Sequence, residues 1–267
     1  MGREKALLNK ELLASAIGEA IGDRWSTSEV AAAAELLAET DGQFPKTIPA
    51  GMLDQRADQQ RARLPSELVK AVQRERILAA MLRVVGEIGY HDVRVQNVLD
   101  KAGLSRPTFY EQFDNKESCF LAAFDAAAKR LRESVEAAGE GGEHWRDRIR
   151  LGLEALLRFI ATEPDAAYTL IVESRGAGPA GVLRHDDLFE HFARCIDAQV
   201  HKELPEAPSK VAADGVVGGI ASVLYARLNK GELDDLDSLL PSLMYFAVLP
   251  YGGHKAAAEE LSGAAPA

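Results

Sequence analysis

The sequence predicts an all-α protein, and three observations support this fold class. Alanine, leucine, glutamate and arginine are abundant, whereas aromatic residues make up only 6% of the 267 residues. No segment shows the run of alternating β-branched residues that is typical of strands. Apolar residues instead recur at helical spacing between glycine and proline breaks, and the hydrophobic content of 47% is sufficient to fill a core.

Cysteine usage and hydropathy together favour the cytoplasm, which is a reducing compartment. The two cysteines, Cys119 and Cys195, lie far apart and form no CxxC pair, so neither a disulfide framework nor a zinc site is predicted. The N-terminal sequence MGREKALLNKE lacks the apolar core of a signal peptide, and no segment approaches the roughly 18 apolar residues needed to span a bilayer. We therefore expect a cytoplasmic protein with no membrane partner.

Charge is distributed unevenly along the chain. The formal net charge is −10 and the pI is about 5.2, which by itself argues against a polyanionic partner. Residues 1–64 contain eight basic and ten acidic side chains, and residues 65–117 contain eight of each. The excess of acid is therefore concentrated in residues 118–267, and the central segment is neutral.

Residues 1–64 are predicted to form a helical N-terminal extension and linker. Helices are expected at 4–22 and 27–39, and residues 41–64 are rich in glycine, proline and polar residues, which indicates a linker. With a net charge of −2, the extension is not expected to grip DNA as a basic arm. Its role is open between an accessory helical pair packed on the next domain, a partner-protein module and a degenerate extra domain, and we favour the first.

The next segment predicts one long helix followed by two short ones. From Ser66 to Ile88 the apolar residues fall on one helical stripe, and Gly89 is expected to end this helix. Two short helices are then expected at 94–102 and 106–112. Together these elements predict a three-helix unit.

Residues 94–113, RVQNVLDKAGLSRPTFYEQF, have the features of a helix-turn-helix. This motif needs two short helices, a small residue in the turn, apolar residues between the helices and polar residues on the outward face of the second. Gly103 allows positive φ in the turn, and Leu104 fills the corner. Ser105 is expected to cap the second helix, where Pro107 is tolerated because its missing N–H would have no intrahelical partner. The inner face of the first helix is formed by Val95, Val98, Leu99 and Ala102.

The second short helix is expected to turn aromatic rings inward and polar groups outward. Phe109 and Phe113 lie four residues apart and are expected in the core. The side chains left toward solvent are Arg106, Thr108, Tyr110, Glu111 and Gln112. Arginine can bind guanine through two hydrogen bonds, the threonine methyl can contact thymine, and a tyrosine hydroxyl suits a phosphate oxygen. Lys116 adds positive charge where the next helix begins, and the N-terminal amides of that helix also favour phosphate.

The segment GLSRPTFYEQFDNKES, with the upstream helix and Gly89-Tyr90, resembles the DNA-binding domain of TetR-type transcriptional regulators. The resemblance covers about residues 71–131, and its most specific part is Ala-Gly-Leu-Ser-x-Pro-Thr-Phe-Tyr-x-x-Phe followed by Asn-Lys-Glu. The positions that it implies for base contacts are Gln96, Arg106, Pro107 and Thr108, and those for phosphate contacts are Tyr110 and Lys116. Ser105 and Arg94 complete the candidate DNA-binding residues.

Two residues depart from the family pattern. Arg94 stands where a serine or threonine helix cap is usual, and it could bind phosphate in place of capping. Glu111 stands where a neutral aromatic residue or histidine is common. It could accept a hydrogen bond from cytosine N4 or tolerate solvent at the groove edge, and we favour the second role.

The remaining sequence predicts further helices. Asp114 and Glu117 are expected to form a capping box that starts a long helix ending near Ala138. The later helical segments are expected at 143–162, 164–174, 180–203, 208–229 and 233–249, with a frayed tail from Gly252. The resemblance implies that this half is the effector-binding and dimerisation domain. The predicted domains are therefore the extension 1–64, the DNA-binding domain 65–131 and the C-terminal domain 132–267.

The resemblance also implies a small-molecule effector and a homodimer. Candidate effector-lining residues are the aromatic residues Phe124, Phe159, Tyr168, Phe192 and Tyr225, and the alternative for each is a place in the core. The segment 208–229 carries Gly215, Gly218 and Gly219, which allow another helix to approach closely. Intrachain packing would explain these glycines too. The resemblance favours a two-fold dimer through helices 208–229 and 233–249, which would bind a palindromic operator.

No sequence pattern supports catalysis, a metal ion or a cofactor. His185 and His191 are six residues apart and therefore do not share a helix face, and the acidic segment 231–238 lacks the ligand alternation of a calcium loop. The leading hypothesis is a transcriptional regulator, specifically a repressor released from double-stranded DNA by a small molecule. The alternative is a helical protein-interaction module that keeps the fold without operator binding, and an all-α enzyme comes third.

Overall fold

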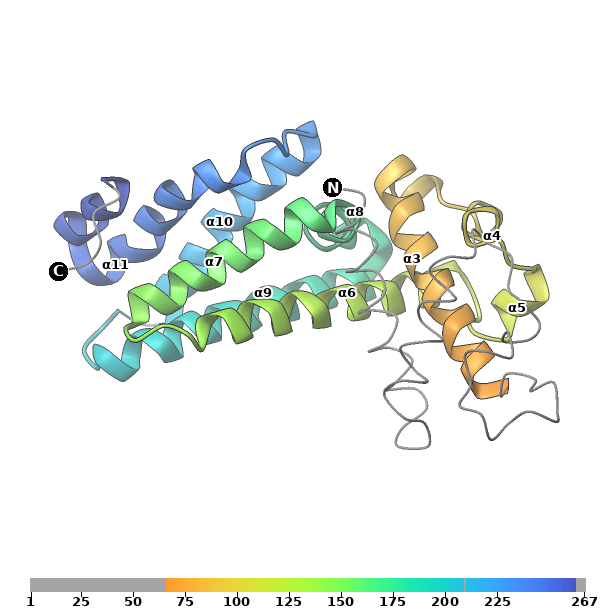
Figure 1. Cartoon of the computed structure of the whole chain (residues 1–267), viewed down its shortest axis with the longest axis horizontal. Helices are drawn as coiled ribbons and strands as arrows, with labels where there is room; N and C mark the ends of the chain where they lie inside the picture. Colours follow the sequence, from red (N-terminus) through yellow and green to blue (C-terminus); the bar gives the residue numbers. More distant parts are fainter. Residues whose placement is uncertain (1–65, 209, 263–267) are drawn as a thin grey trace, which may run out of the picture. The chain divides into compact units, whose positions relative to one another are not determined.

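The computed structural model describes residues 66–208 and 210–262, and this part of the chain consists of helices and turns without a strand. The predicted all-α fold class is confirmed. The α-helices are α3 (Ser66–Asp92), α4 (Val95–Ala102), α5 (Arg106–Tyr110), α6 (Lys116–Gly139), α7 (Trp145–Thr162), α8 (Pro164–Tyr168), α9 (Gly178–Glu203), α10 (Lys210–Lys230) and α11 (Leu240–Leu261), as Figure 1 shows. The helices predicted at 4–22 and 27–39 lie outside the described residues.

The helices divide into two compact units. Among the described residues, the first unit comprises 66–84 and 93–119, and the second comprises 85–92 and 120–262. The division falls inside the long helices α3 and α6. The contacts therefore assign residues 120–131 to the second unit, whereas the sequence placed the domain boundary at 131.

The first unit is formed by most of α3, the two short helices α4 and α5, and the start of α6. Its core is built from large apolar side chains, because each helix turns one apolar stripe inward. Buried members are Ile77, Met81, Val98, Leu99, Phe109 and Phe113. This unit contains the whole predicted helix-turn-helix.

The C-terminal end of α3 contains a kink at Gly89. This residue has φ 73 and ψ 151, which a side chain would disfavour, yet the helix resumes and extends to Asp92. The carboxylate of Glu173 accepts a hydrogen bond from the backbone N–H of Tyr90 at 2.7 Å. The predicted break at Gly89 is confirmed, and the short turn that follows it to Asp92 is supported by this contact and by the aromatic pair of Tyr90 with Phe120.

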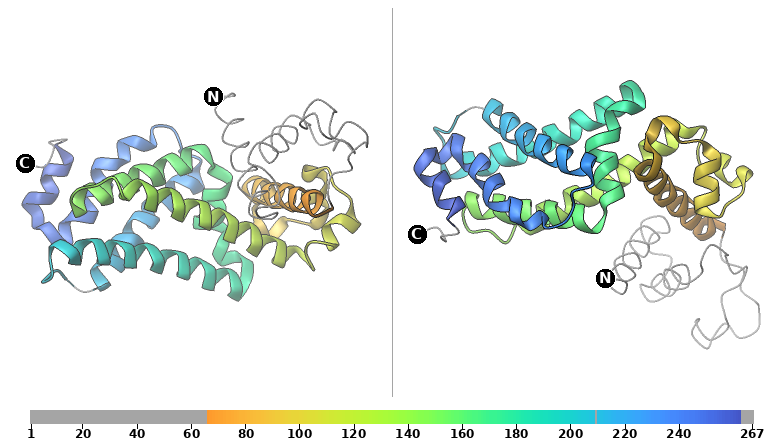
Figure 2. Two further views of the ribbon diagram at one scale, coloured as in Figure 1. Left: turned by 60° about the horizontal axis from the view of Figure 1, so that its bottom comes forward. Right: turned by 90° about the horizontal axis from the view of Figure 1, so that it is seen from above.

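The second unit is a bundle of long helices. In Figures 1 and 2, α7 and α9 extend along the long direction of this unit. The helix α10 packs against α9, and α11 packs against α7. Side-chain pairs connect α6 to α9: Arg184 Nε lies 2.9 Å from an oxygen of Asp125, and His191 Nε2 lies 2.7 Å from Glu136 Oε1.

The segment predicted as one helix at 164–174 is divided into three turns of different geometry. It starts as α8, continues as a π-helical turn over Thr169–Glu173 and tightens into a 3-10 turn over Ser174–Ala177. The buried hydroxyls of Thr169 and Ser174 donate to backbone carbonyls four residues earlier, at 2.8 and 3.0 Å. Such bonds are known to bend helices, which accounts for part of the distortion.

The helix α11 continues further than expected. A frayed tail was predicted from Gly252, but the helix resumes after a break at Gly253, with φ 72, and ends at Leu261. Its last turns carry buried Ala257 and Glu260, so this part is packed on the bundle. The prediction was wrong because small residues in this segment serve close helix packing rather than chain ending.

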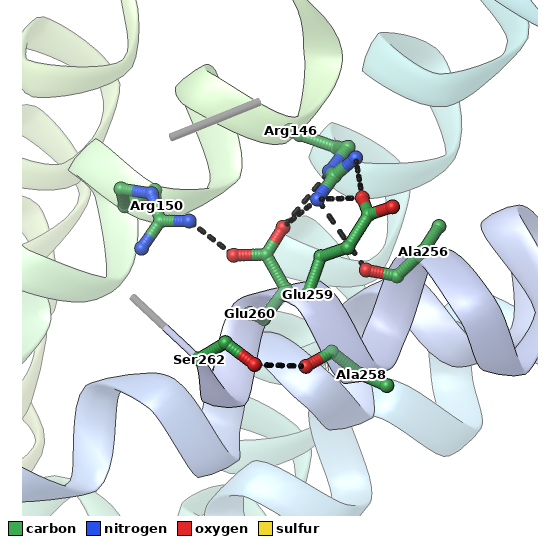
Figure 3. Close-up of polar contacts among 7 residues, drawn as sticks. All are labelled: Arg146, Arg150, Ala256, Ala258, Glu259, Glu260 and Ser262. Carbon is green, nitrogen blue, oxygen red and sulfur yellow. Dashed lines mark hydrogen bonds and ion pairs between the residues drawn. The ribbon is translucent and has the colours of Figure 1, made fainter. Parts of the chain in front are cut away.

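A buried carboxylate fixes the end of α11 to α7. The side chain of Glu260 is only 1% exposed and lies between two arginines of α7, as Figure 3 shows. Its Oε1 accepts from Arg146 Nη2 at 2.5 Å and from Arg146 Nε at 2.8 Å. Its Oε2 pairs with Arg150, and Glu259 contacts Arg146 at 3.4 Å from a more exposed position.

One described helix, α10, is long and apolar enough to cross a membrane by length and composition, which the sequence had not predicted. Two observations weigh against that use. The helix packs against α9 and α11, and the core helices of soluble proteins have the same composition. Only about a third of its apolar window is buried, so the described residues leave one of its faces uncovered.

Candidate functional site

The turn between α4 and α5 is built around Gly103. This glycine has φ 64 and ψ 38, in the left-handed region, and its N–H donates to the carbonyl of Leu99. The guanidinium of Arg76 on α3 donates to the carbonyl of Ala102, which fixes the end of α4 to α3. These contacts confirm the predicted turn and explain why the residue at its centre is a glycine.

The start of α4 shows how the chain accommodates Arg94. This residue occupies the N-cap position, and the side chain of Asn97 accepts a hydrogen bond from its backbone N–H at 2.9 Å. Asn97 therefore supplies a capping hydrogen bond at the start of α4 although the N-cap residue is an arginine. The Arg94 side chain is exposed.

Ser105 caps α5 as predicted. Its Oγ accepts from the backbone N–H of Thr108 at 3.4 Å and lies 2.8 Å from the Thr108 hydroxyl oxygen. The helix is shorter than predicted, ending at Tyr110 rather than at 112. Gln112 instead reaches back to α3, where its Nε2 donates to the carbonyl of Lys70 at 3.2 Å.

The orientation of α5 is set by its aromatic residues. Phe109 is completely buried and packs against the ring of Phe113, with ring centroids 5.7 Å apart. The guanidinium of Arg74 on α3 lies 4.6 Å from the centre of the Phe113 ring, which is a cation–π contact. Because Phe109 points inward, Tyr110 points outward and is 49% exposed.

The outward surface of this unit carries the candidate DNA contacts. The exposed residues are Arg94, Gln96, Ser105, Arg106, Pro107 and Tyr110, and the half-buried ones are Thr108 and Lys116. Gln96 is held in place by a hydrogen bond from its Nε2 to Asp100 at 2.7 Å. Individual DNA contacts by these residues remain predictions, but all eight lie on or beside α4, α5 and the start of α6.

The first turn of α6 corrects one detail of the sequence reasoning. The cap is Asn115, whose Oδ1 accepts from the N–H of Ser118 at 2.8 Å, while Ser118 Oγ accepts from the N–H of Asn115 at 3.2 Å. The predicted pair of Asp114 and Glu117 was therefore wrong by one residue. The corrected cap places Lys116 in the first turn, beside amides that favour a phosphate.

The cysteine of this unit is part of its apolar core. Cys119 is fully buried, and burial raises the pKa of its thiol to about 12 although the charge of Arg74 partly opposes the shift. The thiol therefore stays protonated and packs as a small apolar group.

Comparisons with known proteins agree with this geometry. Residues 77–123 match the family described as bacterial regulatory proteins, tetR family. The HTH-type transcriptional activator FasR of Mycolicibacterium smegmatis is 28% identical over 68% of this chain and 84% of its own length. The HTH-type transcriptional regulator YdgC of Bacillus subtilis is 30% identical over 67% of this chain and 94% of its own length. The chain belongs to the TetR family.

As a member of the TetR family, the protein is a DNA-binding transcriptional regulator, and solved structures share its fold. The fatty acid degradation regulator FadR from Bacillus halodurans has a TM-score of 0.61 at 19% identity, covering 66% of this chain and 94% of that one. FadR from Bacillus subtilis, solved in complex with stearoyl-CoA, has a TM-score of 0.60 at 19% identity, covering 67% of this chain and 98% of that one.

The second unit of this TetR-family chain contains a cavity of about 540 Å³. It is lined by α6, α7 and α9, with Ile220 contributed by α10. Most of the wall is apolar and includes Val135, Ile149, Leu153, Leu156, Phe192 and Ile196. Charged groups lie among these side chains, namely Glu136, Glu140, Arg148 and Lys202. A molecule with both apolar and charged parts fits such a wall.

Of the five aromatic residues predicted to line an effector site, Phe192 lines this cavity. The structure places the other four elsewhere. Phe124 and Phe159 are buried in the core, Tyr168 is half-buried, and Tyr225 is exposed on α10. Aliphatic side chains of α6, α7 and α9 form most of this wall, and the effector contacts of all five aromatic residues stay predictions.

Sequence reasoning also missed a cluster at the cavity wall. Glu136 of α6 and His191 and Cys195 of α9 bring a carboxylate oxygen, an imidazole nitrogen and a thiol within 4.8 Å of one another. Burial raises the pKa of the Cys195 thiol, and Glu136 adds to that shift. The available signal was the spacing of four residues between His191 and Cys195, which places both on one helix face.

Proposed function

We propose that the protein is a homodimeric repressor that binds a palindromic operator and is released by a small molecule held in the second unit. The observation that carries this proposal is the surface of α5. Phe109 and Phe113 anchor the helix in a dry core, which leaves Arg106 and Tyr110 exposed on its outer side. A recognition helix has this arrangement, with base-reading side chains held on a rigid support.

The candidate contacts separate into base-reading and phosphate-binding groups. Gln96, Arg106, Pro107 and Thr108 are assigned to bases, with Arg106 suited to guanine O6 and N7. Arg94, Tyr110 and Lys116 are assigned to phosphates, and Ser105 supports the helix that carries the base contacts. Because residues 65–117 carry no net charge, these few contacts and their repetition in a dimer have to supply the affinity.

The dimer is assigned to α10 and α11, within the predicted segments 208–229 and 233–249. Val211, Gly215, Gly218, Ser222 and Tyr225 form one exposed stripe along α10. A Cβ atom added at Gly215 or Gly218 would meet nothing within 4 Å, so the backbone there is open to another helix. Phe246 on α11 is 49% exposed, which adds an apolar side chain to the same proposed interface.

The effector is assigned to the cavity between α6, α7 and α9. Its aliphatic wall and charged groups suit an amphipathic molecule with a long apolar portion. Stearoyl-CoA, the ligand of the similar FadR structure, is a molecule of this kind. We assign no catalytic step to the protein and place its action in the cytoplasm.

A gel-shift titration with the DNA that flanks the gene tests operator binding. Arg106→Ala is expected to weaken specific binding by about 1–3 kcal/mol and to relax the preference for one base pair. Arg158→Ala removes the same charge from an exposed position on α7 and should leave binding unchanged. Retention that survives Arg106→Ala together with Tyr110→Phe would overturn the contact assignment, and no specific retention of the wild type would favour an interaction module.

Light scattering after size-exclusion chromatography tests the dimer. Gly218→Arg places a long charged side chain on the exposed stripe and is expected to give monomers that lose operator retention. Gly176→Arg changes an equally open glycine outside α10 and α11 and should remain dimeric. A dimer that tolerates Gly218→Arg would move the interface to another surface.

A further inference from the structure

Three potential metal-binding groups meet between α6 and α9. His191 Nε2 lies 2.7 Å from Glu136 Oε1 and 3.7 Å from Cys195 Sγ. The three donor atoms all lie within 4.8 Å of one another. The His191 side chain is 24% exposed and that of Glu136 is 51% exposed, so an ion can reach the cluster from solvent.

The helices impose this arrangement. Residues four apart on an α-helix project from the same face, so His191 and Cys195 form a pair on α9. Glu136 belongs to α6, which α9 also contacts through the ion pair of Arg184 with Asp125 at 2.9 Å. The cluster therefore joins two helices that are also linked by an ion pair elsewhere along their length.

The geometry argues against a nucleophilic cysteine. In a relay of thiol, imidazole and carboxylate, the imidazole uses one ring nitrogen for the thiol and the other for the carboxylate. Here the same nitrogen, Nε2 of His191, lies nearest to both Cys195 and Glu136. Convergence of three donors on one point is instead the arrangement that a shared metal ion requires.

We propose that Glu136, His191 and Cys195 form a Zn²⁺ site with three protein ligands and a fourth position that opens on the cavity. Tetrahedral zinc would separate a histidine nitrogen and a cysteine sulfur by about 3.5 Å. His191 Nε2 and Cys195 Sγ are 3.7 Å apart here, which is close to this value. Glu136 Oε1 is 2.7 Å from His191 Nε2 and would have to move about 0.6 Å further from it to become a ligand of the same ion. Glu136 and Cys195 both line the cavity wall, which gives the fourth position its direction.

The donor set selects the class of metal. Thiolate and imidazole ligands suit zinc, whereas magnesium and calcium prefer sites made of oxygen alone. A soft ion such as Cu(I) would favour further sulfur in place of the carboxylate. The site goes beyond the proposed function, since metal binding is measured without DNA, and either conclusion can fail while the other holds.

The test begins with metal-free, full-length protein titrated with Co²⁺, a spectroscopic substitute for Zn²⁺. We expect one Co²⁺ per chain, with the near-ultraviolet band of a thiolate bound to cobalt and the visible bands of tetrahedral cobalt. Zn²⁺ should displace the cobalt and abolish both signals, whereas excess Mg²⁺ should not. Absence of the thiolate band would overturn the proposal.

Variants identify the ligands. Cys195→Ser should abolish the thiolate band, and His191→Gln and Glu136→Gln should each weaken Zn²⁺ binding at least about tenfold. Glu140→Gln is the matched control, because Glu140 lines the same cavity just after the end of α6 but lies outside the cluster. Binding that survives His191→Gln, or that is lost equally in Glu140→Gln, would overturn the assignment.

A measurement on the wild type excludes misfolding of a variant as the explanation. Cys195 is half-exposed and Cys119 is buried, so a maleimide should alkylate Cys195 in the folded, metal-free protein. Saturating Zn²⁺ is expected to protect Cys195 from this reaction. An alkylation rate that Zn²⁺ leaves unchanged would contradict the proposal whatever the variants show.

Discussion

The two units of this TetR-family regulator bury different kinds of groups. In the part of the chain whose burial the structure describes, the core of the first unit is apolar throughout, including the protonated thiol of Cys119. The buried polar and charged side chains of the same part are Thr169, Ser174, His185 and Glu260, and all four belong to the second unit. The DNA-binding unit therefore keeps its polar groups at the surface, whereas the other unit builds them into its interior.

This difference indicates which polar contacts determine the structure of each unit. In the first unit, Ser105 caps a helix three residues before its partner Thr108, and the longer-range bonds to backbone carbonyls come from Arg76 and Gln112, which are not buried. In the second unit a buried carboxylate joins distant segments, since Arg146 and Glu260 are separated by 114 positions in the chain. Local polar contacts favour helix ends and turns, whereas distant ones determine which helices lie together.

The largest expected effect is therefore at the buried carboxylate of the second unit. Glu260→Gln removes the buried negative charge between Arg146 and Arg150 and leaves the partly buried Arg146 with only the more exposed carboxylate of Glu259 (Figure 3). We expect a loss of about 3–5 kcal/mol in the free energy of unfolding. Thermal unfolding should show a melting temperature lower by on the order of 10 °C.

The neighbouring residue provides a matched control for this prediction. Glu259 contacts the same Arg146, but its side chain is 45% exposed and its shortest contact is 3.4 Å. Glu259→Gln should cost under about 1 kcal/mol, because exposed ion pairs contribute little. Equal losses in the two variants would show that burial of the carboxylate is not what matters, and the comparison between the units would fail.

The same difference explains what could be predicted from the sequence. The turn at Gly103, the cap at Ser105 and the inward Phe109 were all predicted, since each depends on residues close in sequence. The cap of α6 was misplaced by one residue, because Asp114 and Asn115 are both good caps and only the backbone decides between them. The long helices of the second unit were predicted, but their pairings were not.

The cavity and the cluster at its wall depend on such pairings. The sequence suggested aromatic effector contacts, whereas the wall is mainly aliphatic and comes from four helices. Glu136 lies on α6, far in sequence from His191 and Cys195 on α9. No local pattern brings these residues together, so the fold had to be known before the metal-site hypothesis could be stated.

The second prediction concerns the local cap of the first unit. Ser105→Ala removes the acceptor for the Thr108 N–H and should lower the free energy of unfolding by about 1 kcal/mol. Ser262→Ala, which removes an exposed hydroxyl at the other end of the chain, should change it by less than about 0.5 kcal/mol. Chemical denaturation followed by circular dichroism would measure both, and a silent Ser105→Ala would mean that the cap does not stabilise this unit.

A third, smaller effect concerns how the segment 65–117, which carries no net charge, holds DNA. Lys116→Ala should flatten the plot of log binding constant against log salt by about 0.9 for each bound subunit. A change near twice that value would indicate two symmetric subunits on the operator. Titrations at several salt concentrations give the slope, and Lys129→Ala on the second unit is the control. An unchanged slope would remove Lys116 from the phosphate contacts and leave the affinity to base-reading residues.

The smallest effect is a pH dependence that originates in the second unit. His185 is buried against the ring of Phe189, at 4.1 Å between ring centres. Burial lowers its pKa below the usual value of 6.5, and Arg175 adds to this shift while Asp186 opposes it. The unfolded chain therefore takes up a proton more readily than the folded one as the pH falls through 6.5, and stability should fall with it.

His185→Gln should flatten this acid-side loss of stability, because the variant has no imidazole to protonate. Denaturation midpoints measured from pH 7.5 to about pH 5 would show the difference between the two proteins, since carboxylates dominate at lower pH. His254→Gln, which removes an exposed imidazole of α11, should keep the wild-type profile. If His185→Gln also keeps it, the buried imidazole does not contribute to acid sensitivity, and the polar interior of the second unit stabilises it through Glu260 and the hydroxyls alone.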